Sequence, residues 1–173
     1  EYRYRYPIIL DNTLFVTLSQ SGETADTVEA LKAAKIINGN ISTLCITNSA
    51  ESSLTRLSES TFLTHAGPEI GVASTKAFTT QLVALALLTC SIGKLKNTIS
   101  VKQEREIIAG LRRLPGLIND ALLQESKVKK LAVRFKDKNS ALFLGRGTMH
   151  AIAMEGALKL KEISYIHAEA YPA

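Results

Sequence analysis

TLFVTLSQSGET, residues Thr13–Thr24, is the most informative stretch of the chain. Its first half is rich in β-branched and aromatic residues, which favours a short strand over residues 13–18. Its second half is a polar loop, and apolar residues then recur at helical spacing over residues 25–37. A strand, a polar loop and a helix in this order predict one unit of a parallel α/β sheet.

The same alternation continues through the rest of the chain. Nearly unbroken apolar runs predict buried strands at residues 41–47 and 141–144, and a shorter strand is expected at 61–64. Helical patterns are expected at four further places, namely residues 52–58, 74–93, 96–138 and 149–163. The predicted fold class is therefore α/β: a doubly wound, mostly parallel, flavodoxin-like sheet in three α/β/α layers, with the start of a second similar unit.

Two of these helical segments carry more specific expectations. The segment 74–93 is apolar nearly all round at its centre, so it should be largely buried. The segment 96–138 should form one or two amphipathic helices with a break near Pro115. The chain is accordingly divided into a first domain over residues 1–95, a helical connection over 96–138 and the start of a second domain over 139–173.

Composition excludes several classes of protein. Hydrophobic residues make up 46% of the 173 residues and charged residues 21%, which is ordinary for a soluble globular protein. The sequence has no Trp and no basic block interleaved with aromatics, so nucleic acid is not an expected partner. The longest apolar run, Leu82–Leu88, is too short for a bilayer. Cys45 and Cys90 lie in separate apolar runs and are expected to be reduced core residues of a cytoplasmic protein.

The net charge of +5 is unevenly distributed. Residues 96–138 contain eleven Lys and Arg against five Asp and Glu, so the basic excess falls in the helical connection. A solvated helix face is the simplest interpretation of that excess, and a surface for an acidic partner is the alternative.

The polar loop of the first unit has the chemistry of a phosphate cradle. Open parallel sheets bind ligands at the carboxyl ends of their strands, where a following helix offers unpaired N–H groups. The loop adds hydroxyls from Ser19, Ser21 and Thr24, an amide from Gln20, and Gly22 where the backbone must approach a ligand. The competing interpretation is an ordinary helix cap, since Ser and Thr are favoured there. The loop matches neither the P-loop nor the dinucleotide-binding fingerprint.

Four motifs carry a resemblance to a known family. They are SQSGETADT at Ser19–Thr27, EIGVASTKAFTTQ at Glu69–Gln81, LGRG at Leu144–Gly147 and EGALKLKEISYIHAEAY at Glu155–Tyr171. In this order and spacing they resemble the sugar isomerase (SIS) domains of the glucosamine-6-phosphate synthase family, the isomerizing glutamine–fructose-6-phosphate aminotransferases. The first motif alone would indicate SIS domains in general, whereas the second and fourth are more specific.

The resemblance implies a reaction and a set of site residues. Fructose 6-phosphate and glutamine-derived ammonia would give glucosamine 6-phosphate, with no cofactor and no metal. The residues implied in substrate binding are Ser19, Gln20, Ser21, Thr24, Val72 and Ser74. Glu162 corresponds to the general base that moves a proton between C1 and C2, and Lys159 corresponds to its neighbouring lysine.

Glu155, Lys159 and Glu162 are spaced to share one face of a helix. An aldose–ketose shift needs one carboxylate that takes a proton from one carbon and returns it to the next. A lysine within reach stabilises developing negative charge or keeps the carboxylate ionised. The alternative is a routine surface ion pair worth about 0.2–0.5 kcal/mol.

The resemblance also implies partners. Family members carry a glutaminase domain and form homodimers, and both ends of this chain are expected to be truncated relative to them, so the chain alone should lack synthase activity. A non-catalytic phosphosugar-binding SIS module and a simple phosphosugar isomerase are the alternatives. The three histidines His65, His150 and His167 have no metal-ligand spacing, and Arg146 could face either a ligand or an interface.

Overall fold

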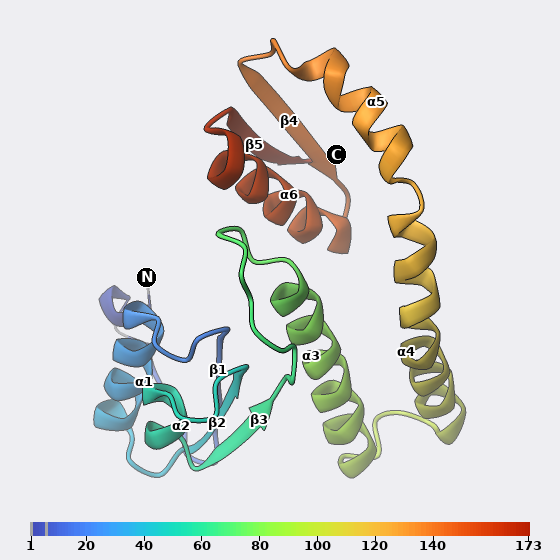
Figure 1. Cartoon of the computed structure of the whole chain (residues 1–173). Coiled ribbons are helices and arrows are strands. Elements are labelled where there is room, and N and C mark those ends of the chain that lie inside the picture. Colours follow the sequence, from blue (N-terminus) through green and yellow to red (C-terminus); the bar gives the residue numbers. More distant parts are fainter. Residues whose placement is uncertain (1, 6) are drawn as a thin grey trace. The chain divides into compact units, whose positions relative to one another are not determined.

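The computed structural model describes residues 2–5 and 7–173, and the chain forms two compact units. The first unit comprises the chain up to Glu69 together with Thr75–Ser100. The second comprises Ile70–Ser74 and Val101–Ala173. Figure 1 shows the order of the elements along the chain, coloured from blue to red.

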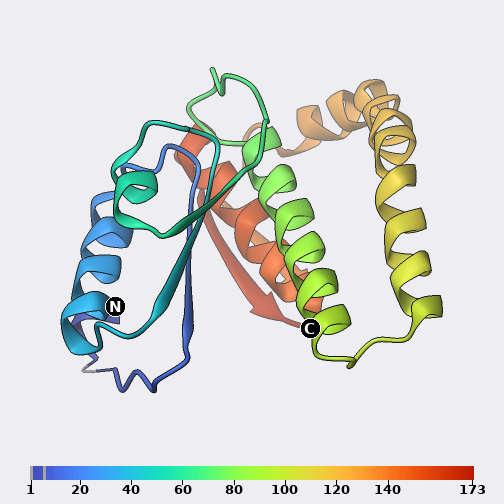
Figure 2. The ribbon, with the colours of Figure 1, turned by 90° about the horizontal axis from the view of Figure 1, so that it is seen from below.

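The first unit is a parallel sheet between helices. Strands β1 (Leu14–Ser19), β2 (Ser42–Thr47) and β3 (Ser60–Leu63) pair in that spatial order, and both pairings are parallel. Helices α1 (Ala25–Ile37) and α2 (Ser53–Leu57) cover one face and α3 (Lys76–Leu95) covers the other, as both ribbon views show (Figures 1 and 2). A single 3-10 turn, η1 (Tyr2–Tyr4), precedes the sheet. The predicted α/β fold with a parallel sheet is confirmed.

The register of the strands brings their carboxyl ends together. Ser19 at the end of β1 lies opposite Thr47 at the end of β2, and Thr47 lies opposite Leu63 at the end of β3. The loops that leave these three strands therefore emerge at one edge of the sheet, where open α/β sheets bind ligands.

The core of the first unit lies between the sheet and helices α1 and α2. It consists of Val28, Leu31, Cys45 and Leu54, with Phe15 and Leu57 packed against them. The strand β2 contributes buried residues on both faces, as predicted for a central parallel strand. Cys45 and Cys90 are both buried, as expected for cysteines in apolar runs, and neither is in a disulfide.

Helix α3 is less buried than its composition predicts. Only its small residues reach burial, among them Ala77, Ala84 and Cys90, whereas Leu87 and Ile92 each keep 39% of their surface exposed. A helix that is apolar all round should be buried on every side. The described residues, however, cover only the side of α3 that faces the sheet. Among those residues α3 is also the one helix long and apolar enough to cross a membrane, a criterion that the core helix of a soluble protein can meet equally well.

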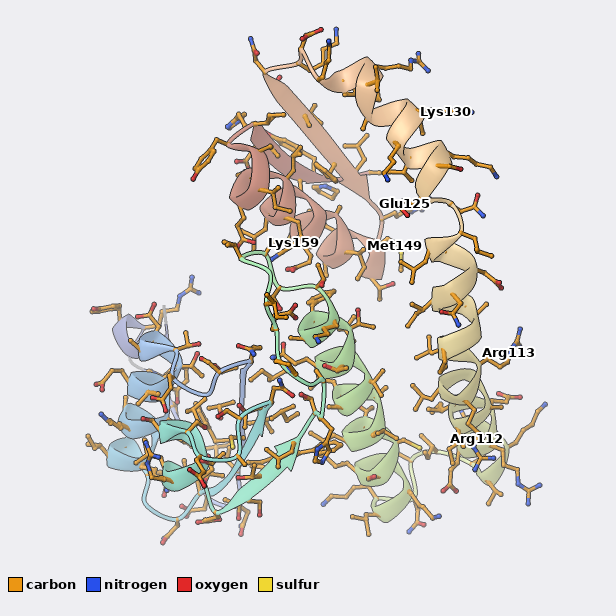
Figure 3. All side chains as sticks on the ribbon, viewed as in Figure 1. Arg112, Arg113, Glu125, Lys130, Met149 and Lys159 are labelled. Carbon is orange, nitrogen blue, oxygen red and sulfur yellow. The ribbon has the colours of Figure 1, made fainter. Side chains whose placement is uncertain are left out.

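The basic segment forms two helices, α4 (Val101–Leu122) and α5 (Glu125–Phe135). Pro115 lies inside α4, so the predicted break near Pro115 is wrong, and the interruption falls at Leu123–Gln124 instead. A proline removes one helical hydrogen bond, and water can replace it here because every described residue of α4 retains some exposure. Figure 3 shows Arg112 and Arg113 as extended side chains of α4.

The second unit contains a two-stranded parallel sheet with one helix on it. Strand β4 (Ser140–Gly145) pairs with β5 (His167–Pro172), and α6 (Thr148–Ser164) connects them. The packing relies on small residues: a side chain on Gly156 would meet the Phe143 ring at 3.0 Å. The expectation that β4 is buried is wrong in part, since Leu142 is 68% exposed and only alternate residues face α6.

Candidate functional site

The predicted phosphate cradle is the loop between β1 and α1, and its hydroxyls are organised before any ligand binds. The Ser19 hydroxyl lies 2.8 Å from that of Thr24 and also accepts the Gly22 N–H at 3.0 Å. The Ser21 hydroxyl accepts the Glu23 N–H at 3.1 Å. Ser21 and Thr24 are exposed, whereas Ser19 is buried at the base of the loop.

The side chain at the cap position of α1 makes no capping hydrogen bond. Thr24 occupies the cap position of α1, but its hydroxyl is engaged with Ser19 instead of with the helix backbone. The first N–H groups of a helix have no partner within the helix and carry partial positive charge. No side chain at the cap position bonds to these donors, and Asp26 places a carboxylate in the same first turn.

The cradle is joined to the start of α2. Gly22 adopts φ +69°, and a side chain there would meet the Ser52 hydroxyl at 2.0 Å. The Gly22 carbonyl accepts the Leu54 N–H at 3.1 Å. Glu23 accepts from both the backbone N–H and the hydroxyl of Ser53, each at 2.6 Å, and these hydrogen bonds lower the pKa of the Glu23 carboxyl.

A polar cavity of about 420 Å³ opens at the same edge of the sheet. One cradle residue, Gln20, lines it. The other lining residues follow β2 and β3, and they are Asn48, Ser49, His65, Gly67 and Pro68. A volume of this size is within the range of small-molecule sites. The cavity therefore extends the cradle towards the loops that follow the two neighbouring strands.

In the second unit, Glu155, Lys159 and Glu162 meet on one face of α6, as their spacing predicts. The Lys159 ammonium lies 2.6 Å from Glu162 and 3.4 Å from Glu155. Its hydrogen bond to Glu162 is the main cause of a raised Lys159 pKa, which partial burial opposes. Lys159 therefore places a positive charge between the two carboxylates on this face of α6.

Glu162 also lines a cavity that contains another predicted residue. This cavity of about 400 Å³ is bordered by Val72 and Ala73 from the segment Ile70–Ser74, and by Ile163 and Tyr165 at the end of α6. Val72 is 96% exposed. An apolar side chain presented to solvent beside a carboxylate–ammonium pair suits contact with the carbon skeleton of a small polar ligand. Ser74 belongs to the same segment.

The remaining candidate residues belong neither to the cradle nor to the cluster of Glu155, Lys159 and Glu162. A cavity of about 370 Å³ along β1 contains Asp26 and Glu29, whose charges do not suit a phosphate. His150 and Lys161 line a smaller cavity of about 180 Å³ with Glu169. Arg146 and His167 are exposed, and their roles stay open. Among the described residues no group of three or more His, Cys, Asp or Glu is placed to hold a metal.

Comparison with known proteins identifies the fold family. The family profile described as SIS domain matches residues 1–91 and 134–173, which is most of the chain. The chain belongs to the SIS domain family. The match covers the SIS cradle, the segment with Val72 and Ser74, and all of α6 and β5.

Individual SIS relatives are close in sequence. The isomerizing glutamine–fructose-6-phosphate aminotransferase of Pseudomonas putida is 57% identical over all 173 residues, and that of Haemophilus influenzae is 56% identical over the same length. The chain spans 28% of the length of each of these relatives.

Solved SIS structures agree with the fold. A structure of the C-terminal domain of glucosamine-fructose-6-phosphate aminotransferase from Francisella tularensis superimposes with a TM-score of 0.93 at 52% identity, covering 98% of this chain and 48% of that one. Glucosamine-6-phosphate deaminase from Thermotoga maritima, at 23% identity and a TM-score of 0.74 over 99% of this chain and 49% of that one, shares the fold.

Two residues that the sequence analysis did not single out hold the cradle and the loop after β3 in place. Glu23 ties the cradle to α2 through Ser53. Asn48 binds the loop after β3, accepting from Ala66 N–H at 2.8 Å and donating to the Gly67 carbonyl at 2.7 Å. The only signal for Glu23 is its place inside SQSGET. Asn48 directly follows the β2 strand, a position that favours site residues in parallel sheets.

Proposed function

We propose that the chain is part of the isomerase region of an isomerizing glutamine–fructose-6-phosphate aminotransferase. In this proposal it binds the sugar phosphate and carries the glutamate that transfers the proton. The observation that supports it most directly is the cradle between β1 and α1, in which the Thr24 hydroxyl is engaged with Ser19 and leaves the start of α1 open to an anion. The 57% identity to an enzyme of that name supports the same function.

The sugar phosphate would be held by uncharged groups that donate hydrogen bonds. Phosphate oxygens accept from hydroxyls and from N–H groups at a helix start without needing a lysine or arginine. Ser19, Ser21 and Thr24 supply the hydroxyls and Gln20 supplies an amide. Val72 and Ser74 would contact the sugar, in keeping with the place of Val72 beside Glu162.

Glu162 would act as the base of the aldose–ketose shift. It would take a proton from C1 of the aminated ketose and return one to C2, so that the carbonyl equivalent moves from C2 to C1 with no net change in atoms. Lys159 would hold the Glu162 carboxylate in position through their 2.6 Å contact. The same ammonium would stabilise negative charge that develops on the substrate.

The wider assignments belong to the same proposal. The ammonia would come from a glutaminase domain of the same polypeptide, and the enzyme would act as a cytoplasmic homodimer without a cofactor or metal. The two buried free cysteines support a reducing compartment.

Calorimetric titration with fructose 6-phosphate tests the binding part of this proposal. The wild-type chain should bind fructose 6-phosphate more tightly than inorganic phosphate or fructose alone. Ser21→Ala and Thr24→Ala should each weaken binding about tenfold, since each removes one hydrogen bond to the phosphate. Absence of fructose 6-phosphate binding both by this chain and by a chain extended at both ends would contradict the proposal.

Proton exchange separates the enzyme from its main alternative, a non-catalytic phosphosugar-binding module. With fructose 6-phosphate in D₂O, proton NMR should show loss of the C1 proton signal in the presence of the full-length protein, because the chain alone is expected to lack synthase activity. Glu162→Gln should abolish this exchange while leaving binding intact. Glu125→Gln is the matched control, because Glu125 pairs with Lys129 at 2.7 Å on an exposed helix and should leave exchange unchanged. Binding without exchange in the full-length protein would favour the non-catalytic module.

A further inference from the structure

We propose that His65 contacts the bound sugar phosphate and that Asn48 is the positioning residue that places it there. Both residues line the polar cavity of about 420 Å³ that also contains Gln20 of the cradle. This inference rests on the proposed function, because it names a further contact for the same ligand. It adds the loop after β3 to a site so far built on the loop after β1.

Asn48 connects the two loops. Its backbone N–H donates to the Gln20 carbonyl at 3.0 Å, so it is anchored to the cradle. Its side-chain oxygen accepts from the Thr64 hydroxyl at 3.2 Å and from the Ala66 N–H at 2.8 Å. Its side-chain nitrogen donates to the Gly67 carbonyl at 2.7 Å. One asparagine therefore fixes the residues on both sides of His65 relative to the cradle.

The backbone of His65 is held in an unfavourable conformation. Its φ is +51°, in the left-handed region that residues with a side chain rarely adopt. Such a conformation persists where the surrounding structure determines it, often at functional sites. Asn48 supplies those hydrogen bonds, and the His65 side chain remains exposed, so core packing does not explain the conformation.

The chemistry of the cavity explains what the imidazole adds. The cradle offers hydroxyls and an amide but no lysine or arginine. His65 lies between this polar cavity and a smaller apolar one of about 230 Å³ lined by Phe62 and Leu87. One edge of the ring can therefore rest on apolar side chains while a ring N–H donates to an oxygen of the sugar phosphate.

Calorimetry with fructose 6-phosphate on a set of variants tests the inference. His65→Gln and Asn48→Ala should each weaken binding about tenfold. This factor corresponds to the loss of one hydrogen bond from His65 to the ligand. Asn48→Asp should fall between wild type and Asn48→Ala, because a carboxylate still accepts from Thr64 and Ala66 but cannot donate to Gly67. Asn38→Ala is the matched control: Asn38 also makes three side-chain hydrogen bonds, to Ile9, Asp11 and Asn40, at the opposite end of α1.

An NMR readout of the histidine rings distinguishes contact from a merely structural role. The His65 imidazole signals, assigned by their loss in His65→Gln, should shift when fructose 6-phosphate is added to the wild-type chain. In Asn48→Ala that shift should shrink, while the Thr24 methyl signal still responds to the ligand. Should Asn48→Ala not fold, as judged by its thermal unfolding, His65→Gln and the wild-type ring signals decide the question.

The possible outcomes separate the two proposals. If Ser21→Ala weakens binding but His65→Gln does not, and the His65 signals stay unmoved, this inference is wrong and the proposed function stands. If neither this chain nor a chain extended at both ends binds fructose 6-phosphate, the proposed function is wrong and this inference is wrong with it. Weakened binding in His65→Gln and Asn48→Ala, with Asn38→Ala unchanged, supports both.

Discussion

The hydroxyls of Ser19 and Thr24 lie 2.8 Å apart across the loop that joins β1 to α1. Thr24 precedes a 13-residue helix, a position where a threonine side chain normally bonds to the helix backbone. Here the Thr24 hydroxyl makes no capping hydrogen bond and instead bonds to the Ser19 hydroxyl in the loop. The cradle thus has a cost in helix stability, and its residues can be separated experimentally from true caps.

Thr24→Val and Ser52→Ala should therefore differ in their effects. Thr24→Val keeps the shape of the side chain and loses one part-buried hydrogen bond, while Ser19 keeps its bond from the Gly22 N–H, so it should lower the free energy of unfolding by about 1 kcal/mol or less. Ser52 is a buried cap of α2 with a reciprocal capping box to Thr55, and Ser52→Ala should cost about 1–2 kcal/mol. Urea unfolding measures both. Equal losses in the two variants would show that Thr24 acts as a cap after all.

Gly22→Ala should be among the most destabilising single substitutions in the first unit. The new methyl group would meet the Ser52 side chain at 2.0–2.4 Å in a backbone conformation of φ +69°. Overpacking and backbone strain together should cost more than about 2 kcal/mol, and sugar-phosphate binding should be lost. Gly110→Ala in α4 is the control, since a side chain there meets nothing within 4 Å and should be neutral or stabilising. A mild effect of Gly22→Ala would contradict the tight contact with Ser52.

Glu23 should make stability depend on pH in the acid range. Hydrogen bonds from Ser53 lower the Glu23 pKa in the folded protein. A carboxyl with a lowered folded pKa contributes stability above its unfolded pKa, and loses it as the pH falls through the folded value. Wild type should therefore be more stable than Glu23→Gln near neutral pH, and the difference should shrink as the pH falls through the acid range. Urea midpoints across that range give the comparison, with Glu29→Gln, which removes a partly exposed ion pair to Lys32, as the control. A difference independent of pH would rule out the carboxylate as its source.

Lys159 should be energetically coupled to both of its glutamates, and more strongly to Glu162. The contact to Glu162 is 2.6 Å and that to Glu155 is 3.4 Å, with side chains that are only partly exposed. Double-mutant cycles with Lys159→Met should give a coupling of about 0.5–1 kcal/mol with Glu162→Gln and less with Glu155→Gln. Raised salt should weaken both couplings. A coupling energy that is larger for Glu155 than for Glu162 would contradict the order of these two contact distances.

Local sequence patterns predicted most elements of the two sheets. Apolar runs at β2 and β4 and helical spacing in α1 and α6 were sufficient, because these patterns reflect contacts made within each α/β unit. The strand β5 was missed, since HAEAYP has no β-branched residue and its alternation depends on two alanines, which have low β propensity. It forms because β4 offers a parallel partner, which is tertiary information.

The site was predictable only where a motif carried it. SQSGET located the cradle, and the spacing of Glu155, Lys159 and Glu162 placed them on one helix face. Asn48 and His65 gave no such signal, because their roles arise from a backbone conformation and from loops that meet only in the folded sheet. The exposure of α3 and the course of α4 through Pro115 likewise depend on what covers each helix, which composition does not specify.

The contact between Gly22 and Ser52 has an evolutionary consequence. Thirty positions separate the two residues, yet the space that one could occupy is already filled by the other. Any lineage that enlarges the first must shrink the second, and shrinking the second gives up the cap of α2. The two positions are therefore expected to be inherited as a pair, and a substitution at either should persist only where the other has changed as well.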